Sequence, residues 1–61
     1  MPSPAAHFRF RADEARIEAR LSADPELRTL FFDIAQAYEN LAANEERLEN
    51  RRAAGVRRAA R

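Results

Sequence analysis

The chain contains no cysteine, no lysine and no tryptophan, and it has a single glycine, Gly55, among its 61 residues. Without cysteine it can form no disulfide framework and no thiolate site, so we expect a protein of the reducing cytoplasm. The longest apolar runs hold three residues, as in Leu30-Phe31-Phe32, whereas a membrane span needs roughly 20. No apolar signal core precedes the first charged residues, so we expect no secretion signal.

Large apolar side chains are scarce as well. Of the 28 apolar residues, 14 are alanine, and an alanine buries little surface. A chain this short lies near the lower limit for independent folding. We therefore expect one domain, spanning 1–61, whose small core makes self-association a natural source of further stability.

Two helices are predicted, one on each side of a single break. Ser3-Pro4 is typical of a helix start, because serine caps free amides and proline suits the first helical position. Ser22-Ala23-Asp24-Pro25 ends one helix and begins the next, since a residue before proline avoids the helical conformation. Gly55 is predicted to cap the second helix at its C-terminus. The predicted segments are a helix over about 4–21, a helix over about 25–54 and a basic tail over 51–61. So short a connection implies an antiparallel two-helix hairpin, and the fold class is all-α.

The first predicted helix carries two apolar faces. Ala12, Ala15 and Ala19 follow Phe8 at heptad-like spacing, and this stripe of small residues allows the second helix to approach closely. A second set lies on nearly the opposite side of the same helix and consists of Phe10, Ile17 and Leu21. A single partner helix cannot cover both faces.

The second predicted helix carries one broad apolar stripe. Its centre line recurs every seven residues and consists of Leu27, Ile34, Leu41 and Leu48. Leu30 and Ala37 flank that line on one side, and Phe31, Ala35, Tyr38 and Ala42 flank it on the other. We interpret the hairpin as half of a homodimeric four-helix bundle with coiled-coil-like packing. The predicted interface residues are Phe10, Ile17, Leu21, Phe31, Phe32 and Tyr38. The alternative is a monomeric hairpin that leaves Phe10, Ile17 and Phe32 exposed.

Three segments of the chain form a recurrent pattern: an aromatic-Arg start at His7-Phe8-Arg9, the turn Asp24-Pro25-Glu26-Leu27-Arg28 and the segment Tyr38-Glu39-Asn40-Leu41-Ala42. With these features the chain resembles a group of short, uncharacterised alphaproteobacterial helical-hairpin proteins. The resemblance covers about residues 7–42 and leaves out the C-terminal tail. It implies a bacterial helical hairpin and carries over no catalytic or binding residue.

The residues that usually carry catalysis or bind metals form no recognisable set. His7 is the only histidine, and no Glu-x-x-His pair is present, so we predict no metal site. Asp13, Glu14 and Glu18 alternate with arginines at helix-neighbour spacing, which is typical of a solvated face. We therefore predict no catalytic residue, no cofactor and no enzymatic activity.

The charge distribution is uneven. Residues 51–61 carry five arginines and no acid, and such an arm can bind phosphates or simply complement the helix C-terminus. The arginines are Arg51, Arg52, Arg57, Arg58 and Arg61. The leading hypothesis is a small interaction or scaffold protein that acts as a homo-oligomer. The alternatives are a nucleic-acid-binding bundle that uses these arginines, and a helix ligand for a larger protein. We expect no membrane association.

Overall fold

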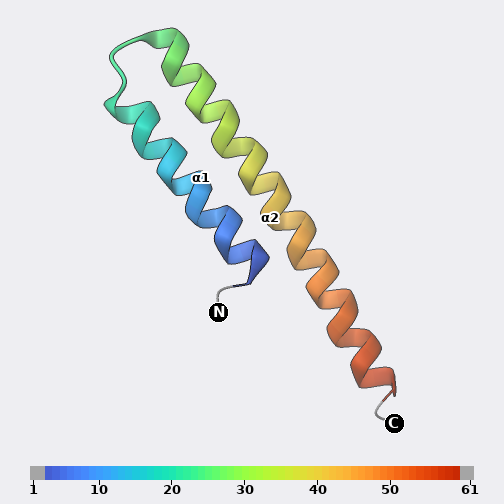
Figure 1. The fold of residues 1–61 in the computed structure, drawn as a ribbon. Coiled ribbons are helices and arrows are strands. Elements are labelled where there is room, and N and C mark those ends of the chain that lie inside the picture. Colours follow the sequence, from blue (N-terminus) through green and yellow to red (C-terminus); the bar gives the residue numbers. More distant parts are fainter. Residues whose placement is uncertain (1–2, 60–61) are drawn as a thin grey trace.

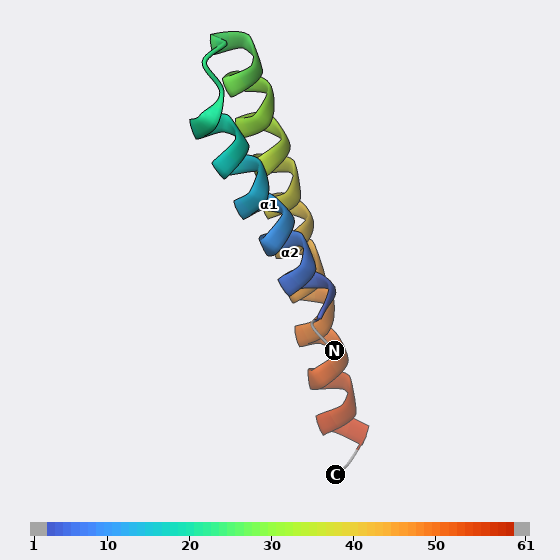
Figure 2. The same ribbon diagram turned by 60° about the vertical axis from the view of Figure 1, so that its left-hand side comes forward.

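The computed structural model describes residues 3–59, with side chains through residue 56. It is an antiparallel hairpin of two helices, α1 over Pro4–Leu21 and α2 over Pro25–Ala59. The principal extents of 57 × 19 × 9 Å give a rod two helices wide and about one helix thick. Figures 1 and 2 show α1 lying along the first part of α2, while the C-terminal part of α2 continues beyond the start of α1. The predicted all-α hairpin is confirmed.

The ends of the hairpin follow from local capping. The hydroxyl of Ser3 accepts a hydrogen bond from the amide of Ala6 at 3.2 Å, and Pro4 occupies the first helical position. At the turn, the carboxylate of Asp24 accepts a bond from the amide of Glu26 at 2.9 Å. Both caps satisfy amides that have no partner inside a helix. The starts at Pro4 and Pro25 and the end at Leu21 agree with the predicted bounds.

The C-terminal end of α2 differs from the prediction. We expected the helix to end at about residue 54 with Gly55 as its cap, but α2 continues through Gly55 to Ala59. A glycine cap needs a left-handed backbone, and Gly55 has no positive φ. Glycine inside a helix costs about 1 kcal/mol relative to alanine, which weakens a helix without ending it. The flanking alanines and arginines are strong helix formers, so most of the predicted basic tail is an extension of α2.

Alanine forms the contact between the two helices. The buried residues of the described chain are all alanine, namely Ala5, Ala12, Ala15 and Ala19 on α1 and Ala35 and Ala42 on α2. Ala5, Ala12 and Ala19 are seven residues apart, as are Ala35 and Ala42, so each series keeps facing the other helix. Such small side chains let the two backbones lie close together. The predicted contact stripe of Ala12, Ala15 and Ala19 is confirmed, and it buries no large side chain completely.

Candidate interaction surface

The close alanine contact leaves most of the large apolar side chains of the described chain at the surface. Ten of them are exposed, from Ile34 at 36% to Leu21 at 75%. Only Phe8, Phe31 and Tyr38 are half-buried. In a typical small domain these side chains would form the core. In this hairpin, most of the large apolar side chains that would form a core therefore lie at the surface.

The largest group of exposed apolar side chains lies along α2. It consists of Leu27, Leu30, Ile34, Leu41 and Leu48, and we call it the α2 stripe. Leu27, Ile34, Leu41 and Leu48 repeat every seven residues, and Leu30 and Ala37 continue the alternating three-and-four spacing between them. This is the a/d pattern of a coiled-coil seam. The alanine contact with α1 uses a different side of α2, so the seam is unpartnered within the hairpin.

A second apolar group lies on the outer face of α1. Phe10, Ile17 and Leu21 are 62%, 52% and 75% exposed. At about 100° per residue they point away from Ala12, Ala15 and Ala19, which contact α2. Charged residues of α1 separate this outer face from the α2 stripe, because Arg11, Glu14 and Glu18 line the groove between the helices on the stripe side. The two apolar groups therefore do not merge into one surface.

The other predicted interface residues are divided by the fold. Tyr38 packs inside the hairpin against Ala12, Ala15 and Ala35. Its ring stacks on Phe8 with centroids 6.3 Å apart. Phe31 is half-buried, and with Ile34 and Tyr38 it lines the groove between the helices. Phe32 is 44% exposed, and by helical spacing it shares a face with Glu39, on the opposite edge of the hairpin. The six predicted interface residues thus do not form one patch.

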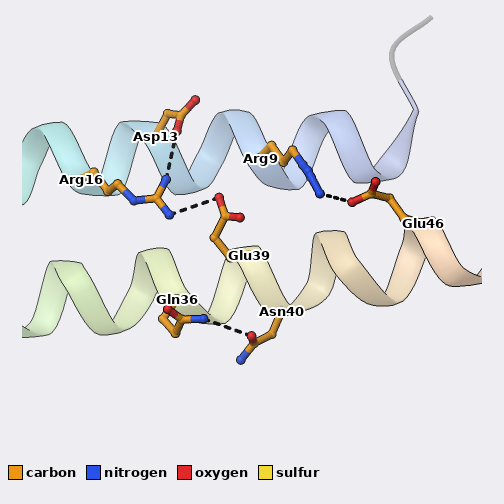
Figure 3. Close-up of polar contacts among 7 residues, drawn as sticks. All are labelled: Arg9, Asp13, Arg16, Gln36, Glu39, Asn40 and Glu46. Atoms are coloured by element: carbon orange, nitrogen blue, oxygen red, sulfur yellow. Dashed lines mark hydrogen bonds and ion pairs between the residues drawn. The ribbon is translucent and has the colours of Figure 1, made fainter.

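Ion pairs between the helices occupy that opposite edge (Figure 3). Arg16 contacts Asp13 at 3.0 Å on its own helix and Glu39 of α2 at 3.2 Å, and Arg9 pairs with Glu46. The two arginines and the two glutamates are each seven residues apart, so both pairs repeat the register of the alanines. These groups are partly exposed, so each pair contributes at most about 1 kcal/mol. They fix the alignment of α1 on α2 more than its stability.

The groove on the stripe side is a shallow hollow of about 210 Å³. Its polar wall is formed by Arg11, Glu14 and Glu18 of α1. The side chain of Tyr38, and then Glu14, hold the pKa of the Arg11 guanidinium above its ordinary value. Because arginine is charged at any physiological pH, this shift changes no protonation state. The charged groups that line the hollow, Arg11, Glu14 and Glu18, lie at the edge of the α2 stripe.

Four of the five predicted nucleic-acid residues lie on the part of α2 that extends past α1. Arg51 and Arg52 are exposed there. Arg57 and Arg58 belong to α2 by their backbone, but their side chains lie outside the described part, as does Arg61 entirely. A second shallow hollow of about 250 Å³ is lined by Asn44, Arg47, Leu48 and Arg51. The first of these predicted arginines, Arg51, lies three residues after Leu48, the last residue of the α2 stripe.

Two further observations concern the described residues. Over residues 3–59, no group of three or more histidine, cysteine or acidic side chains is arranged to hold a metal ion. Neither described helix has an apolar stretch long enough to cross a bilayer.

Comparison with known proteins finds no matching family model, no similar curated protein and no similar solved structure. The resemblance to short alphaproteobacterial hairpin proteins stays a prediction.

Proposed function

We propose that this protein is a small, non-enzymatic helical interaction module that acts as a homo-oligomer, with the α2 stripe as its self-association surface. The observation that carries the proposal is the exposure of Leu27, Leu30, Ile34, Leu41 and Leu48 in one heptad-spaced row. An apolar row of this length on a lone hairpin favours association, because burying it removes apolar surface from water. We expect the protein to act in the cytoplasm.

The α2 stripe is a better candidate than the outer face of α1. The stripe extends over three heptads from Leu27 to Leu48, whereas the α1 face offers only Phe10, Ile17 and Leu21. Glu14, four residues after Phe10, borders this face on the side of the groove, so the α1 face is narrow and flanked by a charge. We therefore propose the α2 stripe as the self-association surface, in place of the interface of Phe10, Ile17, Leu21, Phe31, Phe32 and Tyr38 that the sequence predicts.

The test compares matched charge insertions on the two faces. Ile34→Asp with Leu41→Asp alters the α2 stripe, and Phe10→Asp with Ile17→Asp alters the α1 face. All four positions are exposed, so helicity measured by circular dichroism should persist. Light scattering coupled to size exclusion should give a monomer for the α2 variant and the wild-type mass for the α1 variant. The reverse result would return the interface to α1, and a wild-type monomer would reject self-association altogether.

A specific observation also favours the nucleic-acid alternative. The helix carrying Arg51 and Arg52 extends past α1 as an unpaired arm, and an arginine-bearing helix can lie against phosphates. The test is titration of duplex DNA at low and at moderate salt, with Arg51→Gln and Arg52→Gln as the variant. Salt-sensitive binding that the variant weakens would support this function. Binding absent even at low salt, or unchanged in the variant, would reject it.

A further inference from the structure

The charged residues beside the α2 stripe are sorted by sign along the helix. One row on the side of α2 turned away from α1 repeats every seven residues and consists of Glu26, Asp33, Asn40 and Arg47. Figure 3 shows Asn40, which accepts a hydrogen bond from Gln36 at 3.2 Å, on this outward side. The row is acidic before Asn40 and basic after it. Arg51, at the last position of the seam, continues the basic end.

The two charges on either side of Asn40 in this row, Asp33 and Arg47, have no oppositely charged partner among the described residues. Asp33 is exposed and takes part in no ion pair there. Arg47 is exposed and bonds only to neutral acceptors of its own helix, the side chain of Asn44 at 2.8 Å and the carbonyl of Ala43 at 3.5 Å. By contrast, Arg9 and Arg16 reach acids on the other helix. The charges beside the stripe are therefore available to a molecule that covers it.

We propose that the occupant of the α2 stripe is the α2 stripe of a second copy, packed antiparallel about a two-fold axis near Asn40. This inference rests on the proposed self-association and specifies its geometry. Asp33 and Arg47 each lie seven residues from Asn40, so an axis there places Asp33 of each copy level with Arg47 of the other. Glu26 and Arg51 come to nearly the same level as well. The dimer interface thus contains two equivalent Asp33–Arg47 pairs, as the two-fold symmetry of an isologous contact requires.

The parallel arrangement is disfavoured by the same charges. In a parallel dimer, Arg51 of one copy would face Arg51 of the other within the seam. Residues that flank the seam and differ by five positions meet in parallel coiled coils, so Arg47 of one copy would also lie beside Arg52 of the other. Such a dimer would also bring the two arginine-bearing arms together. The antiparallel arrangement separates these arms to opposite ends of the dimer and sets Leu48 near Leu30 of the partner. Complementary charges of this kind fix partner orientation more than they add affinity.

A charge exchange tests the orientation in the full-length chain. Asp33→Arg alone and Arg47→Asp alone each place like charges together twice per dimer, and each should weaken the dimer about tenfold or more. The double exchange should return the dissociation constant to within about threefold of wild type. Positions 33 and 47 are 14 residues apart, about 21 Å along one helix, well beyond the screening length at physiological salt. Rescue therefore reports pairing between copies.

Disulfide trapping gives an independent readout, since the chain has no cysteine of its own. Asn40→Cys lies at the axis and should form a linked dimer on mild oxidation, whereas Arg51→Cys should not, because its two copies lie at opposite ends. A dimer in which Arg51→Cys links and Asn40→Cys does not, or in which the double exchange fails to rescue, overturns the antiparallel geometry and leaves self-association standing. A wild-type chain that is monomeric throughout overturns both.

Discussion

The substitution Ala12→Leu probes the alanine contact on which the hairpin depends. Ala12 is fully buried and packs with Ala15 and Ala35, with Tyr38 against the same cluster. A leucine adds three carbons where the two helices lie close together, so α1 and α2 must separate or the side chain must leave its preferred rotamer. Overpacking of this kind typically costs 1–3 kcal/mol, and we expect about 2 kcal/mol here. For a domain of this size that lowers Tm by about 8–16 °C.

The assay is thermal unfolding followed by circular dichroism at matched protein concentration, because Tm of an oligomer depends on concentration. The control is Ala53→Leu, which makes the same chemical change at an exposed position on the part of α2 beyond α1. Alanine and leucine differ little in helix propensity, so the control should stay within about 0.5 kcal/mol of wild type. An Ala12→Leu protein as stable as the control would refute the close alanine contact.

Three further predictions concern the C-terminal part of α2, the cap at its start and one ion pair between the helices. Gly55→Ala should raise helicity and stabilise the C-terminal part of α2 by about 1 kcal/mol, because an added Cβ meets nothing within 4 Å and the backbone has no positive φ. Reduced helicity in circular dichroism would mean that Gly55 caps the helix after all. Asp24→Ala should destabilise the hairpin by about 1 kcal/mol in chemical denaturation, because the amide of Glu26 loses its acceptor; an unchanged midpoint would count against the cap. A double-mutant cycle of Arg16→Ala and Glu39→Ala should give a coupling energy below about 1 kcal/mol that shrinks with added salt, since both side chains are about one-third exposed; a larger, salt-independent coupling would contradict a surface ion pair.

Much of the hairpin is predictable from local signals in the sequence. Asp24-Pro25 marks both the end of the loop and the start of α2, because a capping acid before proline favours only that arrangement. The spacing of Ala12, Ala15 and Ala19 predicts which side of α1 meets α2. These signals involve residues close in sequence, so no knowledge of tertiary contacts is needed to interpret them.

Which side of α2 packs against α1 and which side is exposed could be determined only from the structure. Its apolar stripe is wider than one helix can cover, so the sequence does not indicate which part faces α1. Ala35 and Ala42 face α1 because alanine opposite alanine allows the closest approach, and this choice turns Leu41 and Leu48 outward. It also draws Tyr38, predicted for the interface between copies, into the hairpin. The pairs Arg9–Glu46 and Arg16–Glu39 depend on how the two helices align, which spacing within one helix cannot define.

We propose that the α2 stripe, which the alanine contact leaves exposed, is covered by the α2 stripe of a second copy of the chain. The most direct test is the solution mass of the full-length protein, measured by sedimentation equilibrium over a range of micromolar concentrations. We expect a mass of twice the 7.0 kDa of one chain, with dissociation on dilution. A mass of 7.0 kDa at every concentration would contradict it.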